Sequence, residues 1–278
     1  MRCRLLAALL SLSLLLSIVA AAQNPSYTFT TLDVPFPGAN STVANRINDR
    51  GQIVGTYFDP NNLRGFLYED GVFTPFDGPA ADSIVPLGIN NHGQIVGGYA
   101  GHGFLSENGS FTTFDVPGAN GTEAWDINDR GQIVGVYTDQ NGEHGFLYEA
   151  GVFTTLDPPG SVGTEARGIN NRGQIVGFYG DQSGEHGFLD TDGSFTLLEV
   201  PGAHDTTSTG INDRSQIVGV CFDAPCGFLY EDGVFTLLDI PGAATISANG
   251  INNSGLIVGN YRDSSNIAHG FLATPMKK

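Results

Sequence analysis

The chain has 278 residues, with 39 glycines, and its 12 basic and 29 acidic residues give a formal net charge of −17. A surface this acidic repels nucleic acid and anionic lipid, so both are disfavoured as partners. No apolar stretch after residue 22 is long enough to cross a bilayer, so we expect no membrane span.

The first 22 residues have the pattern of a signal peptide. Arg2 and Arg4 precede an apolar run over residues 5–19, and three alanines at 20–22 provide small residues before a cleavage site at Gln23. Loss of the two arginines changes the formal charge from −17 to −19. We therefore expect a secreted or periplasmic monomer in which residues 23–278 form a single domain.

Three short motifs recur six times along the rest of the chain. The first is Ile-Asn-x-x-Gly-Gln-Ile-Val-Gly, with Ser215 for Gly and Leu256 for Gln in the last two copies. Its isoleucines, at positions 47, 89, 127, 169, 211 and 251, lie 42, 38, 42, 42 and 40 residues apart. The others are Gly-Phe-Leu and Phe-Thr-x-Leu/Phe-Asp/Glu. A period near 40 residues suits a β-propeller blade.

Each unit divides into four short strands, A to D, which in the first unit cover about 42–47, 52–57, 64–69 and 72–76. Asp70-Gly71 and Asn108-Gly109 have the composition of two-residue hairpin turns, and no segment after Gln23 has helical spacing. The predicted units are 41–77, 82–115, 120–157, 162–199, 204–239 and 244–274.

The two ends of the chain are offset by one strand. Residues 27–33 form an extra strand D, whereas the last unit stops after strand C. Pairing these ends closes a ring and removes an open sheet edge. We therefore predict an all-β fold, a six-bladed β-propeller of four-stranded blades closed by the N-terminal strand. An open β-solenoid is the alternative, but it does not explain the offset.

The hairpin between strands B and C gives the register of the blade. Tyr99 and His102 flank a two-residue turn, so Gly97 should face Phe104, whose ring would cover the backbone that glycine leaves bare. The same register places Cys221 opposite Cys226. Opposed residues of antiparallel strands are close enough to be bridged, and export favours oxidation, so we predict a disulfide.

Four histidines share one repeat position: His102, His144, His186 and His269. Each faces a tyrosine, and the other two units have Arg64 or Cys226 there, so we interpret this position as a hairpin clamp rather than a metal ligand. The chain has no CxxC or HExxH motif, and we predict no metal or cofactor. The carboxylates that end each strand D are expected to cap the following Pro-Gly turns; a calcium site is the alternative.

A ligand site on a repeat scaffold should lie where the repeats differ, and strand A is the most variable strand. Arg46 and Asp126 replace a glycine that the other units share, and Trp125 is the only tryptophan. An aromatic platform beside charged groups suits a glycan or peptide. The predicted ligand-binding residues are Trp125, Glu123, Asp126, Glu165, Arg167, Arg46 and Asn45. The alternative is that Trp125 packs between blades.

The motif order, from Gly-Ile-Asn-x-x-Gly-Gln-Ile-Val-Gly to His-Gly-Phe-Leu-Tyr-Glu, resembles the HAF-type extracellular repeat family of bacteria. The family's His-Ala-Phe triplet corresponds here to His102-Gly103-Phe104 and its copies, with Gly for Ala. The resemblance covers almost all of residues 23–278 and implies bacterial origin and export. It carries no catalytic residues. Arg64 and Cys226 depart from the histidine, which argues against a family-wide ligand at this position.

Three functional hypotheses follow. The first is a non-catalytic module that binds an unknown extracellular ligand, a glycan or a peptide, at the strand A end of the channel. The second is a carbohydrate-active hydrolase or lyase with Glu123, Asp126 or Glu165 as acid or base, since such enzymes need paired carboxylates around a pocket. The third is a structural extracellular protein. No Gly-x-Ser-x-Gly nucleophile motif is present.

Overall fold

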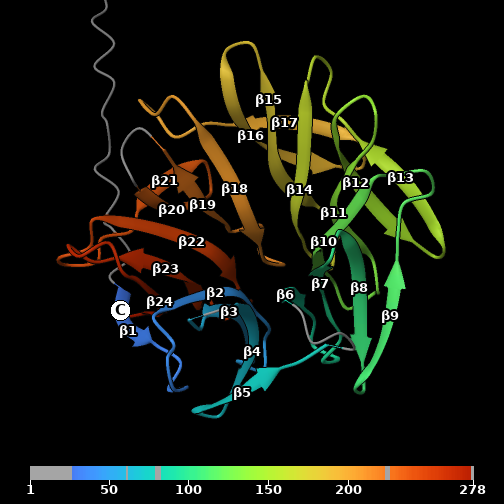
Figure 1. Cartoon of the computed structure of the whole chain (residues 1–278). Helices are drawn as coiled ribbons and strands as arrows, with labels where there is room; N and C mark the ends of the chain where they lie inside the picture. Colours follow the sequence, from blue (N-terminus) through green and yellow to red (C-terminus); the bar gives the residue numbers. More distant parts are fainter. Residues whose placement is uncertain (1–26, 61, 79–82, 223–225, 277–278) are drawn as a thin grey trace, which may run out of the picture.

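The structure is a computed structural model, and it describes residues 27–60, 62–78, 83–222 and 226–276. Its 24 strands form six four-stranded antiparallel sheets that stand around a central axis as blades (Figure 1). The predicted six-bladed β-propeller is therefore confirmed. The predicted signal peptide lies outside the described residues, and among the described residues no helix is long and apolar enough to cross a membrane.

The strands of each blade follow one another in sequence from the axis outward. Blade 1 contains β2 (Ser41–Ile47), β3 (Ile53–Phe58), β4 (Leu63–Glu69) and β5 (Val72–Phe76). Blade 2 contains β6 (Ile84–Ile89), β7 (Ile95–Tyr99), β8 (His102–Glu107) and β9 (Ser110–Phe114). Blade 3 contains β10 (Gly121–Ile127), β11 (Ile133–Thr138), β12 (Glu143–Glu149) and β13 (Val152–Leu156).

The second half of the ring repeats this order. Blade 4 contains β14 (Gly163–Ile169), β15 (Ile175–Asp181), β16 (Gly184–Thr191) and β17 (Ser194–Leu198). Blade 5 contains β18 (Thr206–Ile211), β19 (Ile217–Cys221), β20 (Cys226–Glu231) and β21 (Val234–Leu237). Blade 6 contains β22 (Thr245–Ile251), β23 (Ile257–Arg262) and β24 (Ala268–Pro275), and β1 (Tyr27–Leu32) completes it.

The two ends of the chain close the ring as predicted. β1 pairs antiparallel with β24, with Phe29 opposite Ala273 and Leu32 opposite Gly270. The first strands of the blades (β2, β6, β10, β14, β18 and β22) contact one another around the axis. Strand A is therefore innermost, and its side chains can reach the central channel.

The core of each blade is built on a glycine that faces a phenylalanine. Gly97 lies opposite Phe104 in the ladder of β7 and β8, as the register predicts, and the equivalent phenylalanine of every blade is fully buried. A Cβ at Gly97 would lie 2.7 Å from Phe104 Cε1, so only glycine leaves room for the ring. This pair explains why both residues recur in all six units.

A β-bulge interrupts the inner strand of every blade at the same place. In β10 the register shifts between Ala124 and Asp126, so Trp125 has no partner on β11. A bulge re-aims the side chain of its extra residue. The six bulged residues are Asn45, Leu87, Trp125, Arg167, Thr209 and Asn249.

Two rings of hydrogen bonds join the blades at the end of the channel formed by the A–B turns. In the first, the Asn48 side chain donates to the Asn90 carbonyl oxygen at 3.0 Å, and the same bond repeats through Asn252, which donates to the Asn48 carbonyl at 3.1 Å. The second ring alternates acid and amide: Asp49, Asn91, Asp129, Asn171, Asp213 and Asn253. Asn91 donates to Asp49 and Asp129, both at 2.9 Å.

Asn91→Asp is expected to destabilise the protein by about 1–3 kcal/mol at pH 7. The change removes two donated hydrogen bonds and places three carboxylates side by side, two of them the former acceptors Asp49 and Asp129. Urea denaturation at pH 7 measures the effect. Asn108→Asp, the same change in a C–D turn at φ 50°, is the control. Equal losses in both variants would contradict a special role for the ring.

Candidate ligand site in the central channel

A cavity of about 550 Å³ occupies the channel at the end opposite the two hydrogen-bonded rings. All six bulged residues line it, together with five of the six residues two positions earlier in strand A. Its wall combines polar groups from blades 1, 4, 5 and 6 with apolar groups such as Leu87, Val220 and Phe222. The cavity therefore lies where the sequence variation within strand A predicts a site.

The floor of this cavity is a buried ion pair that crosses the channel. Arg46 Nε lies 3.3 Å from Asp126 Oδ1, and both side chains are 7% exposed. The Arg46 guanidinium also donates to the carbonyl oxygens of Arg167, Thr209 and Asn249, at 2.6, 3.0 and 2.9 Å. Arg46 thus links its own blade to blades 3, 4, 5 and 6, and we call this pair the plug.

Space for the plug comes from the glycines that the other blades keep at the same position. A Cβ at Gly210 would lie 2.7 Å from Arg46 Nη1, and a Cβ at Gly88 would lie 2.7 Å from Asp126 Cα. Burial raises the pKa of Asp126, while the Arg46 charge and the backbone N–H groups of Ile169 and Ile127 lower it in part. Asp126 also accepts the Ile169 N–H at 3.0 Å, so its carboxylate is held within the plug, and it does not line the 550 Å³ cavity.

Trp125, Arg167 and Glu165 form a stack on the cavity wall. The Arg167 Cζ atom lies 3.7 Å from the centre of the Trp125 ring and 5.3 Å from that of Phe178. Its Nε and Nη2 atoms both lie 2.7 Å from Glu165 Oε2. A cation held over an indole and fixed by a carboxylate is a pre-formed arrangement with little freedom left to lose on binding.

Glu123 lies in a second cavity, a groove of about 430 Å³ between blades 2 and 3 that also contains Glu143. Burial raises the pKa of Glu123, and the nearby Arg167 lowers it in part. Burial also raises the pKa of Glu165. These two carboxyl groups hold a proton at higher pH than ordinary glutamates do.

The seven predicted site residues therefore fall into three places. Trp125, Glu165, Arg167, Arg46 and Asn45 line the cavity, Glu123 lines the adjoining groove, and Asp126 lies in the plug. The Asn45 amide donates to the Pro86 carbonyl at 2.8 Å. The Trp125 ring faces the cavity and Arg167, with its Nε1 atom buried and without a hydrogen-bond partner among the described residues.

Sequence reasoning missed the alternating ring of Asp and Asn, although its signal is visible. The third residue of the first motif alternates between Asp and Asn around all six units. This ring borders a small pit of about 60 Å³ at the other side of the plug. Within the described residues, no group of three or more His, Cys, Asp or Glu side chains is placed to hold a metal ion.

The histidines act as clamps on the B–C hairpins. His102 faces Tyr99, as predicted, and its Nδ1 atom lies 2.9 Å from Asp115. His144, His186 and His269 make the same bond to Asp157, Glu199 and Asp33. These carboxylates were expected to cap Pro-Gly turns; they bind histidine instead, because the hairpin brings the imidazole to the end of strand D.

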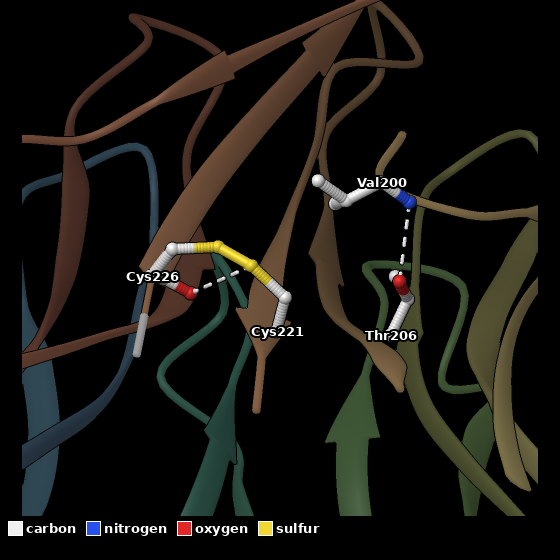
Figure 2. The surroundings of a disulfide bond; sticks show 4 residues. All are labelled: Val200, Thr206, Cys221 and Cys226. Atoms are coloured by element: carbon white, nitrogen blue, oxygen red, sulfur yellow. Dashed lines mark hydrogen bonds between the residues drawn. A yellow bond between two sulfur atoms is a disulfide. The ribbon is translucent and has the colours of Figure 1, made fainter. Parts of the chain in front are cut away.

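Blades 1 and 5 replace the histidine clamp with other chemistry. Arg64 Nε lies 2.5 Å from Asp59 Oδ2 in blade 1. In blade 5 the predicted disulfide joins Cys221 to Cys226, whose Cα atoms are 5.3 Å apart (Figure 2). Both cysteines are buried in the core shared with blade 4. Each blade thus has one covalent or electrostatic clamp beside the open end of the channel.

The clamps predict a stability maximum in mildly acidic solution. Hydrogen bonds to Asp157 and Asp33 raise the pKa values of His144 and His269. Burial lowers the pKa of His186, but its bonds to Glu199 and Asp181 outweigh burial and raise it overall. The pKa of Asp181 is lowered to about 2, first by its hydrogen bonds with Ser183.

Protonated histidine is favoured in the folded state, so its contribution is complete below about pH 6.5 and is lost as pH rises through the raised pKa values. The Asp181 contribution is present above about pH 4 and is lost as pH falls towards 2. We expect the highest Tm between about pH 4 and 6.5, with a fall of a few degrees by pH 9. Calorimetry of wild type and His144→Gln/His269→Gln measures this; an unchanged alkaline slope in the variant would contradict the assignment.

These observations define the class of protein. It is a six-bladed β-propeller whose channel is blocked by an ion pair and opens as a cavity at one end. No family model matches the chain, and no curated protein sequence matches it. The fold is similar to that of virginiamycin B lyase from Staphylococcus aureus, at 15% identity and a TM-score of 0.54, over 91% of this chain and 90% of the other.

Two further solved structures are similar. One is a streptogramin B lyase, at 16% identity and a TM-score of 0.53, over 88% of this chain and 97% of the other. The second is XC5397 from Xanthomonas campestris, described as a gluconolactonase, at 10% identity and a TM-score of 0.56, over 92% of both chains. At such low identities the likeness concerns the fold.

Proposed function

We propose that this chain is an exported, non-catalytic propeller of the HAF-type extracellular repeat kind, and that it binds a glycan or peptide in the channel cavity. The cavity of about 550 Å³ carries the proposal, because the residues that break the repeat pattern gather in its wall. Its volume falls within the range of small-ligand sites. The buried disulfide suits an oxidising compartment.

A binding screen of residues 23–278 against glycans and peptides tests the proposal. Trp125→Ala should weaken any binding at least tenfold, because the ring forms part of the cavity wall and supports Arg167. Phe58→Ala is a matched control, since Phe58 is 48% exposed and does not line the cavity. Binding that survives Trp125→Ala, or that Phe58→Ala weakens equally, would place the ligand elsewhere.

A second candidate function is that of a carbohydrate-active hydrolase or lyase. The raised pKa values of Glu123 and Glu165 support it, since a general acid must keep its proton near neutral pH. Asp126 is not available for this role, because it is bound within the plug. Turnover of a polysaccharide that is lost in both Glu123→Gln and Glu165→Gln would favour the enzyme; binding without turnover would favour the module.

The third candidate function is that of a structural extracellular protein, which a surface without a pocket would support. The channel cavity and its pre-formed Trp125–Arg167–Glu165 stack are features that such a role does not require. Absence of any binding in the screen would favour this candidate.

A further inference from the structure

The groove between blades 2 and 3 results from one short hairpin. In blade 2 only Ala100 and Gly101 separate Tyr99 from His102, whereas six residues separate the equivalent pair in blade 3. The shorter turn leaves an opening of about 430 Å³, part of whose wall is formed by glycines without side chains. Val85 lines both this groove and the central cavity, so the two spaces adjoin.

Four glutamates lie around these two spaces. Glu123 and Glu143 line the groove, and Glu165 and Glu185 line the cavity. Two arginines line the cavity: Arg46 is buried in the plug, and Arg167 is bound by Glu165. His102 lines the groove, but its Nδ1 atom is bound to Asp115. Glu123 forms no hydrogen bond or ion pair within the described part of the chain, so its carboxylate is available to a ligand.

The arginines are distributed unequally between the two ends of the propeller. Four of those that the structure describes lie in A–B turns at the end opposite the cavity: Arg50, Arg130, Arg172 and Arg214. At the cavity end, Arg64 is paired with Asp59 and Arg262 donates to the Asn266 carbonyl. The cavity end therefore carries acidic groups with few cations to balance them, and it attracts positive charge.

The cavity wall also offers groups for an uncharged part of a ligand. Thr207 is 4% exposed, and its hydroxyl has no hydrogen-bond partner among the described residues. Phe222 is 57% exposed at the rim and lines the same cavity. An unpaired buried hydroxyl costs free energy that a polar ligand group could recover, and an exposed phenylalanine suits an apolar side chain.

We propose that the cavity and the groove together bind an extended basic peptide segment. A lysine or arginine of the peptide pairs with Glu123 and Glu143 in the groove, and the adjoining residues lie in the cavity beside Trp125 and Phe222. This inference deepens the proposed function and rests on it, since the same cavity is used. Acidic and apolar contacts in neighbouring spaces match a peptide that carries both cationic and apolar side chains better than a neutral glycan.

The test uses residues 23–278 and the fluorescence of Trp125, the single tryptophan of the chain. The probes are the capped peptide Gly-Lys-Leu-Lys-Gly, its analogue with glutamate in place of lysine, and the neutral glycan cellohexaose. We expect a saturable response to the lysine peptide alone. Glu123→Gln/Glu143→Gln should weaken the binding of the lysine peptide about tenfold or more, because the lysine ammonium in the groove loses both of its carboxylate partners.

The matched control is Asp70→Asn/Asp232→Asn. It removes the same charge from two C–D turns with φ near 50°, a conformation that asparagine also adopts. This variant should change binding less than about twofold. Equal weakening in both double variants would overturn the inference, because general attraction to an acidic protein would then explain the binding. Circular dichroism checks that each variant is folded.

A hairpin graft gives an independent readout. Replacement of Ala100-Gly101 by the six residues 138–143 of blade 3 should narrow the groove and weaken the binding of the lysine peptide. Unchanged affinity in the graft would overturn the groove assignment. No response to the lysine peptide in wild type would also overturn the inference. Cellohexaose binding that titration calorimetry detects in wild type, and that Trp125→Ala weakens in the same assay, would in that case leave the proposed function standing.

Discussion

Arg46→Met is expected to destabilise the propeller by about 3–5 kcal/mol. The methionine side chain is similar in length to that of arginine, but it leaves the buried Asp126 carboxylate without its counter-charge. It also removes the donors to three carbonyl oxygens in blades 4, 5 and 6. Urea denaturation at pH 7 measures the loss, and the midpoint should fall with little change in slope.

Two further variants isolate the cause of this loss. Arg50→Met, at an exposed position in an A–B turn, should change stability by no more than about 0.5 kcal/mol. Arg46→Met/Asp126→Asn should regain part of the stability, because the uncompensated charge is gone while the amide oxygen can still accept the Ile169 N–H. A double variant as unstable as the sum of the two single variants would contradict the plug.

Gly135→Ala is expected to cost about 3 kcal/mol or more, at the upper end of the range for overpacked cores. A Cβ at this position would lie 2.7 Å from Phe146 Cε1 and closer still to the Glu123 carbonyl oxygen. Phe146 is fully buried, so its ring cannot move aside without disturbing the blade. The same clash recurs in every blade, which makes this glycine a requirement of the fold.

The control for this variant is Gly180→Ala. A Cβ there would meet its nearest neighbour, Val162 Cγ2, at 3.8 Å, which is an ordinary contact. We expect a change below about 1 kcal/mol, because the gain from a stiffer unfolded chain offsets small local costs. Comparable losses for the two alanine variants would show that the cost comes from backbone freedom rather than from the ring.

The architecture of the fold could be predicted from the sequence because each blade repeats the same local signals. Six motif copies and the extra strand over residues 27–33 predict both the blade number and the closure. Hairpin dipeptides such as Asp70-Gly71 predict the turns, and both residues adopt positive φ. The strands of blade 1 begin and end within one residue of the predicted bounds.

The sequence predicted the site only in part. Variation within strand A identified the cavity-lining positions. The other three strands are alike in all units because structural constraints limit their residues, so strand A differs from that background. The β-bulge that turns Trp125 and Arg167 towards the channel has no sequence signal of its own. The plug depends on contacts such as Arg46 with Thr209, 163 residues away, and no local pattern reports such a contact.

The sequence also contains a period of two blades, which is visible only when alternate units are compared. Odd blades have Asp in the alternating ring and Tyr68, Tyr148 or Tyr230 in strand C, whereas even blades have Asn and a smaller residue. The alternation has a physical reason, since each ring asparagine donates to two carboxylates and a closed ring of this kind needs an even number of members. Six blades satisfy this condition.

The most direct test of the proposed site is a crystal structure of residues 23–278 with the tightest ligand from the binding screen. We predict ligand density in the channel cavity, in contact with Trp125 and within hydrogen-bond distance of Glu165 or Arg167. Ligand bound on an outer strand, or at the ring of Asp and Asn on the other side of the plug, would contradict the assignment of function to the channel cavity.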